Sequence, residues 1–172
     1  MLNSRESIMS YIIKEPIKCS KKELDEFCSL VKKAGEVDPR GLMNRIKKAK
    51  LLAFHYEQKA IVGIAGLKKP YEKHKTDVFR KAGIPKEASK YDLEIGWAYT
   101  KCDYRGNGIC TNLIKNLLKE FESENIYATV RTNNTAMKKV LKRTGFRQIG
   151  KTYLGRNDRC IQLWVRTKEN TP

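Results

Sequence analysis

The sequence predicts a single α/β domain with a mixed sheet, and three observations lead to this prediction. Its length of 172 residues fits one domain of ordinary size. Amphipathic helical patterns and short β-rich runs follow one another along the chain, with a strand–helix–strand unit near the centre, which is typical of an α/β sheet. No repeat and no internal linker divides the chain. We therefore expect residues 1–172 to form one domain.

The first elements carry clear local signals. Residues 10–18 alternate and predict a strand. Ser20 followed by Glu23 predicts a helix that begins with a capping box, and Gly35 is a natural stop for it. A second, short helix is expected from Asp38, because the next residue is a proline, which is favoured at the first helical position.

The middle of the chain predicts a hairpin, a long loop and a strand. Leu51–Tyr56 and Ala60–Leu67 are β-rich runs separated by a short polar segment, which indicates a hairpin. Pro70–Lys90 is polar and rich in lysine, and we expect a long loop there with one helical turn at most. Tyr91–Thr100 predicts the next strand.

The C-terminal half predicts two helices and three strands, after a loop over residues 101–108. The helices have one apolar face each, and the last two strands have the signature of a closing hairpin. The elements expected are a helix with apolar positions from Leu113 to Phe121, a strand over Ile126–Arg131, a helix over Asn134–Thr144, and strands over Phe146–Leu154 and Cys160–Val165.

The charge of the chain points to an anionic partner without choosing one. The 36 Lys and Arg residues against 19 Asp and Glu give a formal net charge of +17. Such a balance suits nucleic acid, a phosphorylated cofactor or an acidic surface. However, 25 of the basic residues are lysines and 11 are arginines. Since base and phosphate recognition favours the planar arginine fork, this excess argues against a dedicated nucleic-acid reader. The alternative, which requires no anionic partner, is that the lysines form a charged surface that keeps the chain in solution.

Cysteine usage and hydropathy predict a cytoplasmic protein. The five cysteines are odd in number and include no C-x-x-C pair, so we expect neither a disulfide framework nor a zinc site, and no metal. The longest apolar runs are far shorter than the roughly 18 residues of a membrane span, and residues 1–10 lack the apolar core of a signal peptide. We therefore expect no membrane partner.

A glycine-containing loop between a strand and a helix is the most informative segment. It reads Asp103-Tyr104-Arg105-Gly106-Asn107-Gly108-Ile109-Cys110. Two glycines let such a loop turn its N–H groups toward an anion, beside the positive end of the helix dipole. A tight turn without a ligand is the alternative interpretation. The P-loop pattern is absent, and Thr111 occupies the place of the third glycine of the dinucleotide fingerprint.

Two motifs together resemble those of a known family. The loop Arg105–Cys110 looks like the R-x-x-G-x-G/A loop of the GNAT superfamily of N-acetyltransferases. The segment from Asn134 through Thr144, ending in Gly145-Phe146, looks like the downstream Asn-helix-Gly-Phe element of the same family. The resemblance is specific over residues 93–165. It implies the GNAT acyltransferase fold, with a mostly antiparallel central sheet flanked by helices.

The resemblance also implies a binding site for acetyl-CoA. The loop would hold the pyrophosphate through its backbone N–H groups, and Cys110 departs from the small Gly or Ala usual at its place. The strand backbone at Ala98, Tyr99 and Thr100 would pair with the pantetheine arm, and Asn134 would contact this arm or, alternatively, cap the following helix. The implied cofactor-binding residues are Ala98, Tyr99, Thr100, Arg105, Gly106, Asn107, Gly108, Ile109, Cys110 and Asn134.

Candidate catalytic groups are fewer. An amine acceptor must lose a proton before it attacks the thioester, and Glu94 is the best candidate for the general base. Its alternative is a strand glutamate that faces solvent or pairs with a lysine, and His55 is a second candidate that is more often structural. Leu141 stands where many relatives carry a tyrosine that protonates the leaving thiolate. Three tyrosines, none of them singled out by the sequence, could replace it: Tyr99, Tyr104 and Tyr153.

The predicted function is therefore an N-acetyltransferase that moves the acetyl group of acetyl-CoA to a primary amine by direct attack in a ternary complex. The acceptor is a protein N-terminus, a lysine or a small-molecule amine, and the basic variable loops favour an anionic or RNA-associated one. Those loops span residues 38–50, 70–90 and 153–159. The alternative is a non-catalytic module of the same fold that binds CoA or nucleic acid. The oligomeric state is open.

Overall fold

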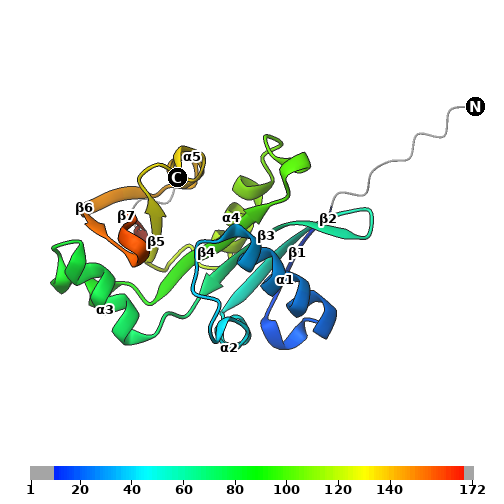
Figure 1. The fold of residues 1–172 in the computed structure, drawn as a ribbon, viewed down its shortest axis with the longest axis horizontal. Coiled ribbons are helices and arrows are strands. Elements are labelled where there is room, and N and C mark those ends of the chain that lie inside the picture. The colour runs from blue at the N-terminus through cyan, green and yellow to red at the C-terminus, as the bar shows by residue number, and fades with distance from the viewer. Residues whose placement is uncertain (1–9, 169–172) are drawn as a thin grey trace, which may run out of the picture. The chain divides into compact units, whose positions relative to one another are not determined.

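One seven-stranded sheet runs through residues 10–168, the part of the chain that the computed structural model describes (Figure 1). Its strand order is β1-β2-β3-β4-β5-β7-β6. β4 and β5 are parallel, whereas β1 with β2, β5 with β7 and β6 with β7 are antiparallel. The predicted mixed, mostly antiparallel sheet flanked by helices is confirmed. The chain divides into two compact units, of residues 1–66 with 97–117 and of residues 67–96 with 118–172, and the expectation of one domain stays a prediction.

The strands at the start of the first unit include a corrected prediction. β1 (Ser10–Lys14) pairs with β2 (Leu51–Glu57), and β3 (Ala60–Lys68) follows as the expected hairpin. The first strand does not continue to Lys18. Pro16–Lys18 instead forms a short 3-10 turn, η1, with Pro16 buried, because a proline has a fixed φ and no N–H to give to a strand ladder.

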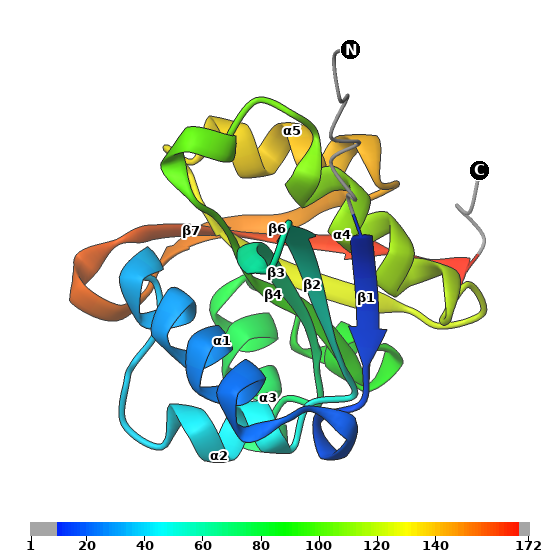
Figure 2. The same ribbon diagram turned by 90° about the vertical axis from the view of Figure 1, so that its right-hand side faces the viewer.

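Local hydrogen bonds decide where the helices of this unit begin. α1 (Lys21–Ala34) starts with the predicted capping box: Ser20 Oγ accepts from the N–H of Glu23, and the Glu23 carboxylate accepts from the N–H of Ser20. α2 begins later than predicted, over Leu42–Lys47. The Asp38 carboxylate accepts bonds from the backbone and guanidinium of Arg40, and this local turn competes with a helix start at Asp38. The two helices lie side by side (Figure 2).

Aromatic side chains form the centre of the first core. The ring of Phe27, from α1, meets those of Phe54 and Trp97 edge-on, with ring centroids 5.6 and 6.1 Å apart. α4 (Ile109–Lys119) approaches β3 closely, since a Cβ on Gly63 would lie 2.6 Å from Ile109 Cγ2. A side chain at position 63 would therefore displace the start of α4.

The second unit contains a helix where the sequence predicted a loop. α3 (Glu72–Lys81) and the 3-10 segment η2 (Pro85–Lys90) occupy most of residues 70–90. Phe79 stacks on Tyr91 and meets Tyr127 edge-on, each with centroids 5.3 Å apart. The prediction was wrong because only a narrow apolar stripe packs inward, and the other positions of α3 carry charged side chains.

The remaining elements of this unit follow the prediction closely. β4 (Leu93–Thr100) enters the unit with residues 93–96 and continues into the first one. The elements after it are β5 (Ile126–Arg131), α5 (Thr135–Arg143), β6 (Arg147–Leu154) and β7 (Cys160–Arg166). Ile126 lies opposite Leu93 on one side and opposite Arg166 on the other, which places β5 between β4 and β7.

Three general features describe residues 10–168. None of the helices there is long and apolar enough to cross a membrane. No group of three or more His, Cys, Asp or Glu side chains in that range could hold a metal ion. All five cysteines are free thiols.

Candidate functional site

The loop from β4 to α4 has the backbone that an anion cradle needs. After a 3-10 turn, η3 (Cys102–Tyr104), Gly106 and Gly108 adopt φ of +85° and +74°. A Cβ at Gly106 would meet nothing within 4 Å, so the positive φ and not crowding favours glycine there. α4 begins directly afterwards at Ile109, and the first N–H groups of a helix have no partner inside it. The loop therefore ends in unpaired donors at the positive end of a helix.

Arg105 ties this loop back onto its own strand. Its Nε donates to the carbonyl oxygen of Thr100 at 3.0 Å, and its guanidinium lies 5.7 Å from the ring centroid of Tyr99. The amide of Asn107 donates to the carbonyl of Tyr104 at 3.3 Å. Both side chains thus help to fix the shape of the loop.

The strand before the loop departs from regular β geometry. Trp97 has a φ of +54°, which is rare for a residue with a large side chain. Further along β4, Thr100 Oγ1 is buried with no hydrogen-bond partner in the described part of the chain. A buried hydroxyl without a partner is costly. Together with the loop donors, this hydroxyl fits a polar ligand such as the arm of CoA along Ala98–Thr100.

Two other predicted cofactor-binding residues have structural roles here. Burial raises the pKa of the Cys110 thiol to about 11, so the thiol is protonated at neutral pH. Asn134 Oδ1 accepts from the N–H of Met137 at 3.0 Å, which makes Asn134 the N-cap of α5. The cap is the alternative expected from the sequence, and a contact of Asn134 with CoA stays a prediction.

Glu94 lies at the centre of a buried polar cluster in the second unit. Its side chain is 4% exposed and its Oε1 lies 2.6 Å from Nζ of Lys68. Tyr127 Oη donates to Oε2 at 3.2 Å, and His74 Nε2 lies 3.5 Å from the same oxygen. These side chains come from β4, β3, β5 and α3. Glu94 is therefore paired with a lysine, one of the two arrangements weighed as alternatives to a free general base.

The charges around Glu94 decide its protonation state. Burial by itself raises the pKa of a carboxyl group, but the ammonium of Lys68 and the imidazole of His74 outweigh burial and lower the pKa of Glu94 to about 2. Burial and the neighbouring carboxylate raise the pKa of Tyr127. Glu94 is thus anionic at neutral pH. A general base works best with a pKa near the working pH, so Glu94 alone is a weak base.

The absence of a side chain at Gly96 makes room for the contact between Lys68 and Glu94. Gly96 lies two residues after Glu94, on the same face of β4. A Cβ at this position would lie 2.9 Å from both Cε and Nζ of Lys68. Any side chain at position 96 would therefore push the ammonium group of Lys68 from its place beside Glu94.

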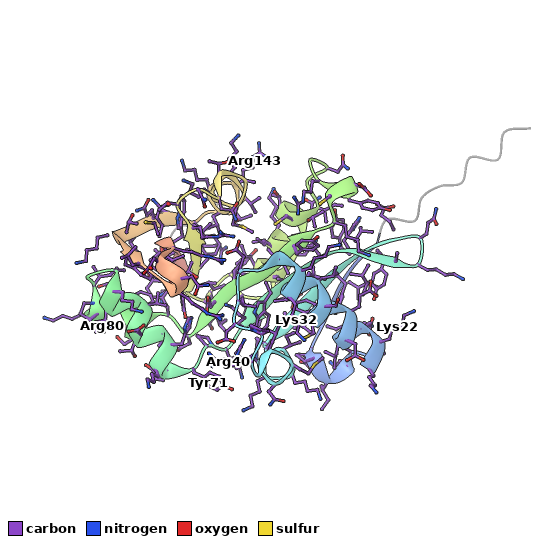
Figure 3. The ribbon with its side chains drawn as sticks, in the orientation of Figure 1. Lys22, Lys32, Arg40, Tyr71, Arg80 and Arg143 are labelled. Atoms are coloured by element: carbon purple, nitrogen blue, oxygen red, sulfur yellow. The ribbon has the colours of Figure 1, made fainter. Side chains whose placement is uncertain are left out.

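His74 is the residue of this cluster that reaches solvent, and the sequence did not single it out. Its side chain is 53% exposed. It borders a recess of about 810 Å³ along α3, called the α3 recess below, which is lined by Tyr71, Glu72, Lys73, His74, Thr76, Asp77 and Arg80. Tyr71 and Arg80 extend away from the ribbon in Figure 3. Recognition of α3 as a helix, from Lys75, Val78, Phe79 and Ala82 on one face, would have placed His74 beside a buried strand.

His55, the second candidate base, is buried in the first unit. It has no exposed surface, and its Nε2 lies 3.1 Å from Oε1 of Glu57. The ring of Tyr11 covers it with centroids 4.3 Å apart. Its environment matches the structural interpretation of a lone strand histidine.

Tyr153 is one of the three tyrosines that could act as the general acid. Burial raises the pKa of its hydroxyl above the ordinary value.

Comparison with known proteins places the chain in a family. A family model described as "Acetyltransferase (GNAT) family" matches residues 22–146. No curated protein matches the sequence significantly. Among solved structures, the chain resembles an N-acetyltransferase from Staphylococcus aureus Mu50, with 14% identity and a TM-score of 0.67 over 92% of this chain and 99% of that one.

Two further solved structures show the same fold at low identity. An acyl-CoA N-acyltransferase from Pseudomonas aeruginosa is 15% identical with a TM-score of 0.64, over 92% of this chain and 99% of that one. The ribosomal-protein-S18-alanine N-acetyltransferase from Escherichia coli is 12% identical with a TM-score of 0.63, over 91% and 93%. At these identities the likeness concerns the fold.

Proposed function

The chain belongs to the GNAT family of acetyltransferases, and from this premise we propose that it transfers the acetyl group of acetyl-CoA to a primary amine by direct attack in a ternary complex. The observation that carries the proposal is the loop Arg105–Cys110, whose two positive-φ glycines lead into the N-terminus of α4. We propose a cytoplasmic location, as the free thiols suggest.

The binding of acetyl-CoA follows from the chain's own donors. Backbone N–H groups from Arg105 to Cys110 hold the pyrophosphate, and the helix dipole adds to the attraction. The backbone of Ala98–Thr100 pairs with the pantetheine arm, and the Thr100 hydroxyl gains the partner that it lacks. Since the loop follows the C-terminal end of β4, an arm along these residues points the thioester toward the irregular backbone at Trp97.

The chemistry requires a neutral amine and a stabilised oxyanion. The amine nitrogen attacks the thioester carbonyl carbon, and a backbone N–H beside the irregular backbone of β4 stabilises the negative oxygen that forms. Leu141, which replaces the family tyrosine, is 1% exposed and packs in the core. A thiol has a pKa of about 8–9, so CoA leaves with little help from a general acid. Glu94 takes part in removing the proton from the acceptor amine.

Calorimetry with acetyl-CoA tests the proposal. Gly108→Glu puts a carboxylate into the phosphate loop, and we expect at least a 100-fold loss of affinity. Gly35→Glu is the matched control, because Gly35 also has a positive φ and open space around it but ends α1. We expect the control to bind like the wild type. A wild type that shows no acetyl-CoA binding, or equal losses in both variants, would overturn the proposal.

A second candidate function rests on an uneven charge distribution. Residues 125–168 contain eleven Lys and Arg residues and a single acidic one, Asp158. Lys139, Lys142 and Arg143 are exposed on α5, and Arg143 points away from the ribbon (Figure 3). Such a surface suits a polyanion, and the candidate is a non-catalytic module that binds RNA.

Binding of single-stranded RNA at several salt concentrations tests this candidate. It predicts an affinity that falls steeply with log salt and no release of CoA from acetyl-CoA with any amine. CoA release with one amine in a panel of peptides, aminoglycosides, polyamines and aminoacyl-tRNA would exclude it. The same panel tests the acceptor class, because we propose an anionic or RNA-linked acceptor, and preferred turnover of polyamines would contradict that choice.

A further inference from the structure

The contact between His74 and Glu94 joins a buried carboxylate to a half-exposed imidazole. Glu94 Oε2 lies 3.5 Å from His74 Nε2 and also accepts from Tyr127 Oη at 3.2 Å. Its other oxygen is held by Lys68 at 2.6 Å. Both oxygens of Glu94 therefore already have partners within the protein, and the side chain is only 4% exposed. The only member of the pair that faces solvent is the imidazole, on the edge of the α3 recess.

The partner of Nε2 sets the tautomer of His74. A carboxylate accepts but does not donate, so the neutral imidazole carries its hydrogen on Nε2 and its lone pair on Nδ1. No described residue bonds to Nδ1. This arrangement is that of a histidine base oriented by an acid, in which the carboxylate fixes the ring and stabilises the imidazolium that forms.

We propose that His74 is the catalytic general base and that Glu94 is a positioning residue that acts through it, with the amine acceptor approaching along the α3 recess. This inference rests on the proposed acetyltransferase function and names the group that Glu94 serves. It also assigns a role to the Lys68 contact, since the ammonium keeps Glu94 anionic and thereby unable to donate its own proton.

The proton and electron pairs balance without a further reactant. His74 Nδ1 takes a proton from the acceptor ammonium, and the neutral nitrogen attacks the thioester carbon of acetyl-CoA. The C–S bond then breaks, its electron pair stays on sulfur, and sulfur takes a proton from solvent to give the CoA thiol. The attacking nitrogen loses its second proton to solvent, and the imidazolium returns its proton to solvent, which its exposure permits, so that one proton is released in each turnover.

Charged and titratable groups surround the pair on every side that packs against it. Lys68 comes from β3 and Tyr127 from β5, and Tyr153 on β6 interacts electrostatically with Glu94. Glu72 and Asp77 lie on α3 itself and line the recess. Glu72 pairs with Lys75, and Asp77 pairs with Arg80 and Lys81, so their charges are largely compensated.

Steady-state kinetics with His74→Gln form the first test, using the amine of the panel that the wild type turns over fastest. We expect kcat/KM to fall 100-fold or more with unchanged acetyl-CoA affinity, because a general base contributes about 10² to 10⁴ in rate. The wild-type rate should rise with pH, because a general base accepts a proton only in its neutral form, and the variant should lose most of that rise. Imidazole added to the variant should restore part of the rate.

Controls separate this inference from the function itself. Lys119→Gln changes an exposed side chain of the same unit away from the recess and should keep full activity. Glu94→Gln should lower kcat/KM without changing acetyl-CoA affinity, because the imidazole loses the carboxylate that orients its ring. If the wild type releases CoA and binds acetyl-CoA but His74→Gln matches it at every pH, the inference fails and the function stands. If the wild type does neither, the function itself fails.

Nuclear magnetic resonance gives a readout that needs no acceptor. Nitrogen-15 spectra of the histidine rings at high pH should show His74 with its hydrogen on Nε2 in the wild type. The Glu94→Gln variant should lose this preference. A wild-type His74 that carries its hydrogen on Nδ1 would overturn the inference whatever the kinetics show.

Discussion

Glu94→Gln offers the sharpest test of the buried cluster through stability. Glutamine has nearly the same size as glutamate and can still accept the hydrogen bond from Tyr127. It has no charge, so the ammonium of Lys68 loses the oxygen that lies 2.6 Å from it. Because the Lys68 side chain is only 17% exposed, water can replace that partner only in part. The variant should therefore be destabilised without a change in packing.

Two independent arguments give the size of this effect. The pKa of Glu94 is lowered from 4.5 to about 2 in the folded chain, and at 1.36 kcal/mol per unit this shift corresponds to about 3 kcal/mol of stability. Removal of one partner from a buried ion pair costs about 3–5 kcal/mol in other proteins. We therefore expect Glu94→Gln to lower the free energy of unfolding by about 3 kcal/mol at pH 7.

The same shift predicts how the effect depends on pH. Since the pKa of Glu94 is lowered by folding, its stabilisation is complete above pH 4.5 and is lost as the pH falls toward 2. The wild type should thus lose stability across this window. The variant has no group to protonate at position 94, so its loss there should be smaller and the two curves should converge at low pH.

Urea unfolding, followed by circular dichroism from pH 7 down to pH 3, measures both quantities. Lys68→Met in the Glu94→Gln background should recover part of the loss, because the mostly buried ammonium that lost its carboxylate is removed as well, and the cycle yields the coupling energy. Glu87→Gln is the matched control: it removes the exposed ion pair with Lys90 and should cost less than about 1 kcal/mol. Equal effects of Glu94→Gln and Glu87→Gln would refute the reasoning.

Further predictions concern the backbone and the thiols. Gly150 has a φ of +65°, and a Cβ there would lie 2.5 Å from the carbonyl oxygen of Ala82, so Gly150→Ala should lower the free energy of unfolding by more than about 2 kcal/mol. Gly35 has a similar φ, but a Cβ there would meet nothing within 4 Å. Gly35→Ala should therefore cost only about 1 kcal/mol in the same urea experiment. Equal losses in the two variants would contradict the crowding argument. Because burial raises the pKa of Cys110 to about 11, its alkylation by iodoacetamide at pH 8 should be at least 10-fold slower than that of exposed Cys160, as peptide mass spectrometry can measure.

Short-range signals in the sequence predicted most elements well. The capping box of Ser20 with Glu23 and the stop at Gly35 depend on neighbours within four residues, so the sequence alone contains them. The strand over Ile126–Arg131 and the cap at Asn134 were found for the same reason. Errors arose where two local preferences compete. Pro39 favoured a helix start, but the bond between Asp38 and Arg40 delays it to Leu42.

The candidate site shows the same difference between local signals and contacts made across the chain. The phosphate loop is continuous in sequence, so its motif could be recognised before the structure was known. The cluster around Glu94 draws on β3, α3, β4 and β5, and its members Lys68 and Tyr127 lie 26 and 33 positions from Glu94 along the chain. No spacing rule connects them. His74 was missed for a further reason, since α3 carries so many charged residues that its apolar stripe was overlooked.

The last strand of the sheet order, β6, has a consequence for how copies of this protein meet. An edge strand with free N–H and C=O groups can pair with another chain and start aggregation. The pairing of β6 with β7 is interrupted between Ile149 and Tyr153, Gly150 turns the backbone, and the N–H of Lys151 donates to Ala82. Exposed basic side chains at Arg147 and Lys151 would also repel a second copy. At physiological salt the edge therefore resists growth of the sheet by strand addition, and this protection should weaken as added salt screens the charges.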